Sequence, residues 1–348
     1  MQLDTNYLKN RFLMASALPR IFCLRLRLAY RQWSLSPDKK SGEPPDQNPD
    51  SSSSLCITPF LESGKERIEK TLDALNQQHP NLPYAHLFLA ARYSLLSSAK
   101  RLRPLLVLAT VSSYGVSLEK ALQPACAIEM VHTYSLIHDD LPCMDDDDFR
   151  RGNPTLHKVY PESHAILTGD YLLTTAFEIL ANSPGLSDSQ KIDLVRTLAK
   201  NAGGHGMIGG QVIDMATENK GIDWSLLEMM HHYKTGCLII ASLVSGAIIA
   251  NAPLSDRLTL EKVGKKIGIA FQIVDDLLDL TGTLQEMGKN CGSDQNKNKT
   301  TALSFMSTTE CQIKAKELLE SALEDLDTLS QPAPLLSSLF LKLVDRTR

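Results

Sequence analysis

The feature that most constrains the fold is a succession of helix-length segments separated by short turn signals. Apolar residues recur at spacings of three and four, and the two-residue alternation of a half-buried strand is absent. Proline and glycine fall between the segments, where they end helices. The segments cover residues 59–78, 84–98, 103–113, 118–140, 162–181, 188–206, 224–250, 256–281, 308–328 and 333–345. The sequence therefore predicts an all-α protein.

One segment is apolar enough to suggest a membrane span. Residues 235–254 carry no charge over 20 positions, which is the length needed to cross a bilayer. Ser242, Ser245, Gly246 and Asn251 lower its hydrophobicity, and the other helices have polar faces. We expect this segment to be the central buried helix of a bundle, with no membrane span.

The N-terminal segment differs in composition from the rest of the chain. The first 35 residues interleave six Lys or Arg with apolar residues, and residues 36–54 are rich in Ser, Pro, Asp and Gly. The latter cannot bury enough apolar surface to order itself. We expect residues 1–58 to be a disordered or targeting-like extension and residues 59–348 to be one helical domain. A cytoplasmic location is expected, or a plastid or mitochondrion if the basic segment is a transit peptide.

Charge and cysteine content exclude several classes of protein. The net charge is −4, and residues 1–54 contribute eight Lys or Arg against five Asp or Glu, so the remaining chain is distinctly acidic. Nucleic acid is therefore not expected as a partner. The seven cysteines are odd in number and never form CxxC. Neither a zinc ribbon nor a disulfide framework is indicated.

The strongest functional signal is HDDLPCMDDDDFRRG at residues 138–152, with six Asp within ten positions. Asp139 and Asp140 close an apolar helix, so their charges lie beside the core unless a cation neutralises them. On a continuous helix Asp139 and Asp145 would lie about 240° apart, and Pro142 predicts that the helix ends between them. The pattern favours a divalent metal at this point.

A second acidic cluster lies within a helix, in AFQIVDDLLDL at residues 270–280. Asp275 and Asp279 are one turn apart on the same face, with Asp276 beside them. Like charges at this spacing destabilise a helix unless a cation lies between them. Because no His or Cys accompanies these hard oxygen ligands, Mg²⁺ is favoured over zinc.

Basic residues accompany both acidic clusters. Lys and Arg beside carboxylate-bound Mg²⁺ are the components of a diphosphate site, because the metal bridges carboxylate to phosphate and the cations neutralise the outer oxygens. These residues are Lys100, Arg101, Arg103, Arg150, Arg151, Lys234, Lys289 and Lys299. An acidic domain can thus bind an acidic substrate.

The motifs and their order resemble those of the trans (E-type) isoprenyl diphosphate synthases, and most closely the bacterial farnesyl diphosphate synthases. The first Asp-rich motif of that family, DDxxxxD, matches Asp139, Asp140 and Asp145. The resemblance covers about residues 60–348 and includes RYSLLSSAKRLRP, GGQVIDM, YKTG and FQIVDDLLD. It implies an isoprenoid-synthase-type fold, one large bundle around a central cleft, and a homodimer.

The resemblance also implies a role for each matching residue. Three Mg²⁺ ions are expected on Asp139, Asp140, Asp145, Asp275, Asp276 and Asp279. The allylic diphosphate is expected to contact Arg150, Lys234, Lys289 and Lys299. Isopentenyl diphosphate is expected to contact Lys100, Arg103, His132 and Arg151. Thr235 and Gln272 would line the reacting carbons, and the residues expected to act in catalysis are Lys234, Thr235, Gln272 and Arg150.

The implied reaction condenses isopentenyl diphosphate with dimethylallyl and geranyl diphosphates. Tyr134 lies five positions before Asp139, about 7.5 Å along a helix, and Ser135 lies next to it. If the growing chain runs back along this helix, a bulky ring there forms the floor of the site and stops growth at the C15 product. Farnesyl diphosphate is therefore expected, with geranylgeranyl diphosphate as the alternative product.

Two other functional classes are alternatives, and the sequence departs from the family motifs at two points. The doublet His138-Asp139 suggests an HD-type metal phosphohydrolase, which leaves the second acidic cluster unexplained. A catalytically silent partner subunit is disfavoured because both Asp motifs are intact. The usual Gly-Gly before Lys100 is replaced by Ser98-Ala99, and Thr301-Ala302 stands where Tyr-Pro is commoner. These departures leave the nearby loop geometry open.

Overall fold

The computed structural model describes residues 57–76, 81–281 and 299–344. Most of the predicted N-terminal extension, and Lys289 with its segment, lie outside these residues. The described helices are α2 (Ile57–Leu75), α3 (Ala85–Leu95), α4 (Leu102–Ser113), α5 (Glu119–Asp139), α6 (Leu156–Val159), α7 (Glu162–Asn182), α8 (Asp188–Ala202), α9 (Met207–Thr217), α10 (Trp224–His231), η1 (His232–Gly236), α11 (Cys237–Ile249), α12 (Leu254–Thr281), η2 (Ala302–Ser304), α15 (Thr308–Leu326) and α16 (Pro334–Val344). The all-α prediction is confirmed.

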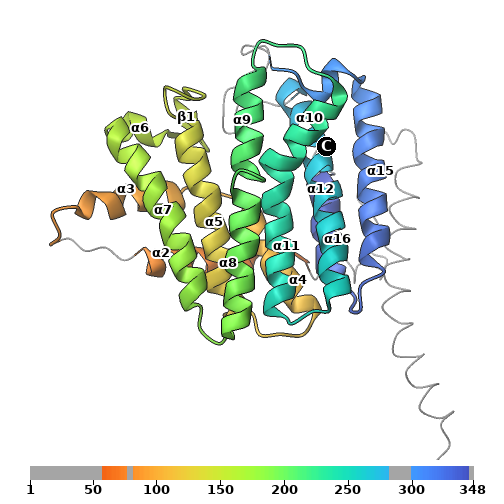
Figure 1. Ribbon diagram of the computed structural model, residues 1–348, viewed down its shortest axis with the longest axis horizontal. Helices are drawn as coiled ribbons and strands as arrows, with labels where there is room; N and C mark the ends of the chain where they lie inside the picture. Colours follow the sequence, from red (N-terminus) through yellow and green to blue (C-terminus); the bar gives the residue numbers. More distant parts are fainter. Residues whose placement is uncertain (1–56, 77–80, 282–298, 345–348) are drawn as a thin grey trace, which may run out of the picture.

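The long helices stand side by side and form one bundle (Figure 1). Helix α5 packs on α7 at one side, α12 packs on α15 at the other, and α11 contacts α4, α8 and α12 between them. Leu238 of α11 belongs to the core on the α5 side, while its neighbour Ile239 belongs to the core on the α12 side. Because successive helical residues point in different directions, one helix joins both cores.

The long uncharged segment is the centre of the bundle. All residues of α11 are buried. The stretch Trp224–Ile249 is long and apolar enough to cross a membrane, yet 83% of its most apolar window is buried inside the protein. A helix that is apolar on all sides is expected at such a position, and the predicted buried central helix is confirmed.

The structure corrects two of the predicted segments. The segment predicted as one helix over residues 188–206 ends at Ala202, and α9 follows as a separate helix that the pattern missed. Glycine has low helix propensity, and a Cβ at Gly206 would lie 2.1 Å from the Asn201 carbonyl oxygen, so only glycine fits that turn. The segment over residues 224–250 contains η1, a π-helical turn, between α10 and α11.

Strand structure is not wholly absent from the described residues. Strands β1 (Phe149–Arg150) and β2 (Asn153–Pro154) form a two-stranded antiparallel hairpin directly after the first Asp-rich motif. Its turn residues, Arg151 and Gly152, have φ values of 54° and 80°. Positive φ at both central positions matches the tight hairpin turn whose twist suits paired strands. The hairpin is too short to show a strand pattern in the sequence.

Candidate active site

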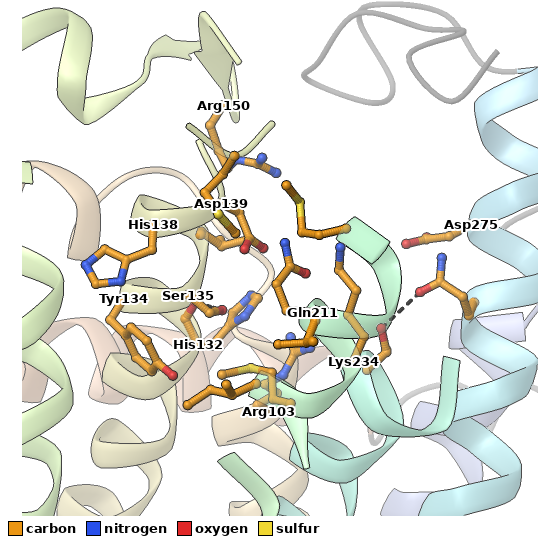
Figure 2. Close-up of a pocket in the computed structure, with 18 of the residues that line it drawn as sticks. Arg103, His132, Tyr134, Ser135, His138, Asp139, Arg150, Gln211, Lys234 and Asp275 are labelled. Carbon is orange, nitrogen blue, oxygen red and sulfur yellow. Dashed lines mark hydrogen bonds between the residues drawn. The ribbon is translucent and has the colours of Figure 1, made fainter. Parts of the chain in front are cut away.

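A cavity of about 1570 Å³ lies among helices α4, α5, α7, α9 and α12 and the π turn η1. Figure 2 shows acidic, basic and amide side chains projecting into it from opposite walls. The sequence-predicted residues that line it are Lys100, Arg103, His132, Tyr134, Ser135, Asp139, Arg150, Arg151, Lys234, Thr235, Gln272 and Asp275. The fold thus gathers residues that are up to 175 positions apart in the sequence.

Asp139 and Asp145 are brought together because α5 ends between them. The helix stops at Asp139, and the Asp145 backbone N–H donates to the Asp139 carbonyl at 2.8 Å. The predicted end of the helix before Asp145 is confirmed. Burial raises the pKa of Asp139, because a carboxylate removed from water is disfavoured in its charged form. A cation in this position would relieve that cost.

Asp140 does not line the large cavity and instead binds the hairpin. Its carboxylate accepts from Arg150 Nε at 2.7 Å, and Arg150 also pairs with Asp147 at 3.1 Å. Burial raises the pKa of Asp140 to about 6, while Arg150 opposes the rise. Tyr93 Oη donates to the Pro154 carbonyl at 2.8 Å and fixes the far strand of the hairpin. Asp140 therefore positions Arg150 at the rim of the site.

The second acidic motif lies on α12, across the cavity from α5. Asp275 lines the large cavity, as Figure 2 shows. Asp276 is buried and accepts from Gln272 Nε2 at 3.2 Å through one oxygen and from the Ala302 N–H at 2.8 Å through the other. Asp279 is buried on the same helix and does not line this cavity.

A smaller cavity of about 220 Å³ lies where the two acidic motifs meet. Lys299 Nζ reaches it and contacts Asp145 at 3.2 Å and Asp214 at 3.1 Å. Lys234 Nζ contacts the same Asp214 at 2.6 Å. These two lysines hold the pKa of Asp214 below its ordinary value, although burial opposes them.

Asp214 is a residue of the site to which sequence reasoning gave no role. It lies in the quoted motif GGQVIDM, on α9, and joins the lysines of two segments. The signal that could have found it is an acidic residue within an otherwise apolar helical stretch. A buried carboxylate of this kind requires a cationic partner.

The π turn η1 presents Lys234 and Thr235 to the cavity. π turns often occur at functional sites because the extra residue redirects side chains. Glycines allow the close packing around it: a Cβ at Gly210 would lie 2.2 Å from the Lys234 nitrogen, and a Cβ at Gly268 would lie 2.4 Å from the Gly236 Cα. Thr235 Oγ1 donates to Gln272 Oε1 at 2.9 Å.

The basic end of the cavity contains Lys100, Arg103, His132 and Arg151. Burial lowers the pKa of Arg103 to about 10 and that of His132 well below its ordinary value, with the nearby arginines adding to the effect on His132. The imidazole is therefore neutral, and the arginines bring positive charge that Glu129 offsets in part. An anion placed here would be stabilised.

Arg101 shapes the loop that carries Lys100. It is buried, adopts a positive φ of 52°, pairs with Glu129 of α5 at 2.9 Å and donates to the carbonyls of Leu95 and Ser97. These bonds close the Ser98-Ala99 loop without the usual two glycines. The first departure noted in the sequence therefore leaves the basic end assembled.

The predicted floor lies along α5 below Asp139. Tyr134 is buried and packs edge-to-face on His138 with ring centroids 5.7 Å apart. His138 Nε2 lies 3.0 Å from the Ile166 carbonyl of α7, and a Cβ at Gly169 would overlap the His138 ring. The Tyr134 ring thus packs against His138, which α7 holds in place, and it lines the cavity.

The chain is similar to one known protein family over most of its length. A family model described as Polyprenyl synthetase matches residues 85–332. The chain is 46% identical over 253 residues to the farnesyl diphosphate synthase of Bacillus subtilis (strain 168), covering 72% of this chain and 85% of the relative. The chain belongs to the polyprenyl synthetase family.

The chain is similarly close to relatives that are named for other products. The chain is 43% identical to the chloroplastic geranylgeranyl pyrophosphate synthase of Capsicum annuum, covering 78% of this chain and 73% of the relative. A solved structure described as the geranyltransferase from Helicobacter pylori complexed with magnesium and isoprenyl diphosphate has a TM-score of 0.71 and 34% identity, covering 83% of this chain and 98% of that one. The predicted resemblance to the family is confirmed.

The donor set of this polyprenyl synthetase fits magnesium. Asp139, Asp145 and Asp275 offer oxygen only, which suits Mg²⁺. Among the described residues no three His, Cys, Asp or Glu side chains form a ready metal-binding group. Mg²⁺ commonly binds through one or two carboxylates and takes its remaining ligands from substrate phosphates and water. The arrangement therefore suits a metal that arrives with a diphosphate.

Proposed function

We propose that this polyprenyl synthetase is a Mg²⁺-dependent farnesyl diphosphate synthase that condenses isopentenyl diphosphate with dimethylallyl and geranyl diphosphates. The observation that carries the proposal is one cavity of about 1570 Å³ with carboxylates at one end, half-buried arginines at the other and an aromatic ring along its apolar wall. Two diphosphates and one growing hydrocarbon chain require these three environments in one space. The similarity to several farnesyl diphosphate synthases supports the same conclusion.

The carboxylate end takes the allylic diphosphate. Asp139, Asp145 and Asp275 would hold Mg²⁺, three ions in all, with Asp140, Asp276 and Asp279 supporting them. Magnesium bound there would neutralise the diphosphate and make it a better leaving group. Lys234, Lys299 and Arg150 contact the outer oxygens, since all three reach the smaller cavity. Lys289 is proposed for the same role, although it lies outside the described residues.

The basic end takes isopentenyl diphosphate. Lys100, Arg103 and Arg151 bind its phosphates by charge-assisted hydrogen bonds, and neutral His132 donates a further one. This arrangement holds the second substrate with its alkene facing the allylic carbon. Correct alignment of two bound reactants removes much of the entropic barrier to their reaction.

The reaction then proceeds by ionisation, condensation and elimination. The bond between C1 and oxygen breaks and its electron pair leaves with diphosphate, so the allylic carbon becomes cationic. The C3–C4 alkene of isopentenyl diphosphate donates an electron pair to that carbon, and C3 becomes cationic. Loss of a proton from C2 then restores a double bond. Thr235 and Gln272 line the reacting carbons, and the released diphosphate accepts the proton.

The product length is set by Tyr134, with Ser135 beside it. The buried ring occupies the cavity wall below Asp139, and its contact with His138 restricts its motion. A chain that grows along α5 meets this ring after the second condensation. We therefore favour the C15 product over the C20 product.

A homodimer completes the proposal. Helix α7 exposes Leu167 at 58% of its surface, together with Ile166, and neither residue lines the large cavity. Exposed apolar groups of this kind favour contact with another protein surface. Light scattering of the purified protein should give twice the mass of one chain.

The test of function is a turnover assay with isopentenyl diphosphate, Mg²⁺ and each of the C5, C10 and C15 allylic diphosphates, with product length read by chromatography. We expect C5 and C10 primers to give farnesyl diphosphate. A C20 product would identify a geranylgeranyl diphosphate synthase. No condensation by the purified chain would favour a silent partner subunit, and release of phosphate without condensation would favour a phosphohydrolase.

The Tyr134→Ala variant tests the proposed floor. Removing the ring opens space along α5, so product should shift to C20 or longer while the first condensation keeps nearly its wild-type rate. Tyr114→Ala is the matched control, because that tyrosine binds Asp256 and lies outside the large cavity. An unchanged product distribution in Tyr134→Ala would contradict the assignment.

A further inference from the structure

Gln211 presents an amide to the large cavity that the protein itself does not use. The residue lies on α9 and lines the cavity. Both amide atoms are shielded from solvent, and neither has a hydrogen-bond partner among the residues that the structure describes. Buried amides are nearly always paired, because an unpaired one loses its hydration without compensation. An unpaired buried amide that lines this cavity is therefore available to bind a ligand.

The position of the amide indicates which part of the ligand it meets. In Figure 2 Gln211 projects from α9 with Asp139 on one side and Lys234 on the other, and with His132 and Arg103 below it. All five residues line the same cavity. The first pair belongs to the proposed allylic end and the second pair to the proposed isopentenyl end. Gln211 thus lies between the two proposed diphosphate ends of the cavity, where the reacting carbons would meet.

The neighbouring amide is already committed to other bonds. Gln272 accepts from Thr235 through its oxygen and donates to Asp276 through its nitrogen. Asp214, one turn along α9 from Gln211, is likewise engaged by Lys234 and Lys299. Gln211 therefore differs from its polar neighbours in having its full hydrogen-bonding capacity available to the reactants.

We propose that Gln211 is a further catalytic residue, whose amide oxygen faces the allylic carbon and stabilises the positive charge that develops there. This inference rests on the proposed function. Before ionisation the carbon is neutral and gains little from the oxygen; after the C1–O bond breaks, the dipole points its negative end at a cation. A fixed dipole in a site closed to water acts strongly on such a charge.

Measurements of melting temperature and kcat distinguish a catalytic role of Gln211 from a structural one. Gln211→Met keeps the length of the side chain and removes a buried unpaired amide, so the melting temperature should stay the same or rise. The turnover number kcat should fall, on the order of 10²-fold, as for loss of other preorganised dipoles. The matched control is Gln190→Met, because the buried Gln190 amide donates to the Ile248 and Ile249 carbonyls at 3.0 Å. That variant should lose thermal stability and keep its kcat.

The decisive experiment compares two inhibitors on the holoenzyme with Mg²⁺. One is an ammonium analogue, with a charged nitrogen in place of the reacting carbon, added together with inorganic diphosphate. The other is a thiodiphosphate analogue of geranyl diphosphate, which is neutral at that carbon. We expect Gln211→Met to weaken the ammonium analogue about 10-fold more than the thiodiphosphate. Equal weakening of both, or no change in either, would overturn the proposal. Turnover by the wild-type protein, measured in parallel, shows whether the proposed function itself holds.

Discussion

The two Asp-rich motifs use the same residue type on different frameworks. In the first, α5 ends at Asp139, and a loop brings Asp145 back to it through a backbone hydrogen bond. In the second, Asp275 lies within the continuous helix α12, and neighbouring acidic residues come from the same helix. The first motif therefore depends on a loop and a hairpin for its geometry, whereas the second depends on helical periodicity alone.

Each motif contains a doublet whose members have different surroundings. Asp139 and Asp275 line the large cavity, while Asp140 binds Arg150 and Asp276 binds Gln272 and the Ala302 backbone. Adjacent residues on a helix point about 100° apart, so the two carboxylates of a doublet have different partners, although Asp275 and Asp276 both line the smaller cavity. The comparison indicates that only the first member of each doublet lines the large cavity, while the second member binds a group of a neighbouring element.

The largest effect is expected at the first members of the doublets. Asp139→Ala or Asp275→Ala should lower kcat by at least about 10²–10³-fold, because each removes a carboxylate that would hold Mg²⁺ against the diphosphate. The helical circular-dichroism signal should stay at its wild-type value, which serves as the control for folding. Near-wild-type turnover in either variant would show that the cavity-facing carboxylates are not the metal ligands.

A smaller effect is expected at the second members. Asp140→Asn and Asp276→Asn should lower kcat by about 10–100-fold, the usual cost of losing a group that orients a ligand residue. The Mg²⁺ concentration for half-maximal rate should stay unchanged in both, since protein groups already bind these two carboxylates. The measurement is an initial-rate titration with Mg²⁺, with Asp275→Asn as the positive control. A shift in the Mg²⁺ midpoint for Asp276→Asn would restore the metal-ligand role that the family resemblance implies.

Local pattern was sufficient to predict most of the helices and the pairing of Asp139 with Asp145. The period of three and four residues reports which face is buried, and Pro142 marks the helix end. The separate helix α9 was missed because Gly203, Gly204 and Gly206 obscure where one helix stops and the next begins.

Ion pairs between residues far apart in the chain could not be predicted from the local sequence pattern. Asp214 gains its role only when Lys234 and Lys299 reach it, 20 and 85 positions further along the chain. The doublets are a different case, because helical geometry already implies that Asp139 and Asp140 diverge. The metal-ligand roles given to Asp140 and Asp276 from the resemblance remain predictions, while the structure supplies each with protein partners.

The smallest expected effect concerns His231, which accompanies the second motif. It is buried, with Nε2 3.8 Å from Asp276, and burial lowers its pKa to about 4. An unfolded histidine has a pKa near 6.5, so between these values the unfolded chain binds the additional proton and stability falls as the pH falls. This residue should cost about 2 kcal/mol of unfolding free energy between pH 7.5 and pH 5.

Urea unfolding of His231→Gln at the two pH values measures that cost. The variant should lose less stability on acidification than the wild type, because its amide does not titrate. Some pH dependence should remain, since burial also lowers the pKa of His132. The control is the same substitution at the exposed His205, which should leave the acid sensitivity unchanged. If His231→Gln and the wild type lose equal stability on acidification, the buried His231 beside the second motif does not cause the acid sensitivity of the protein.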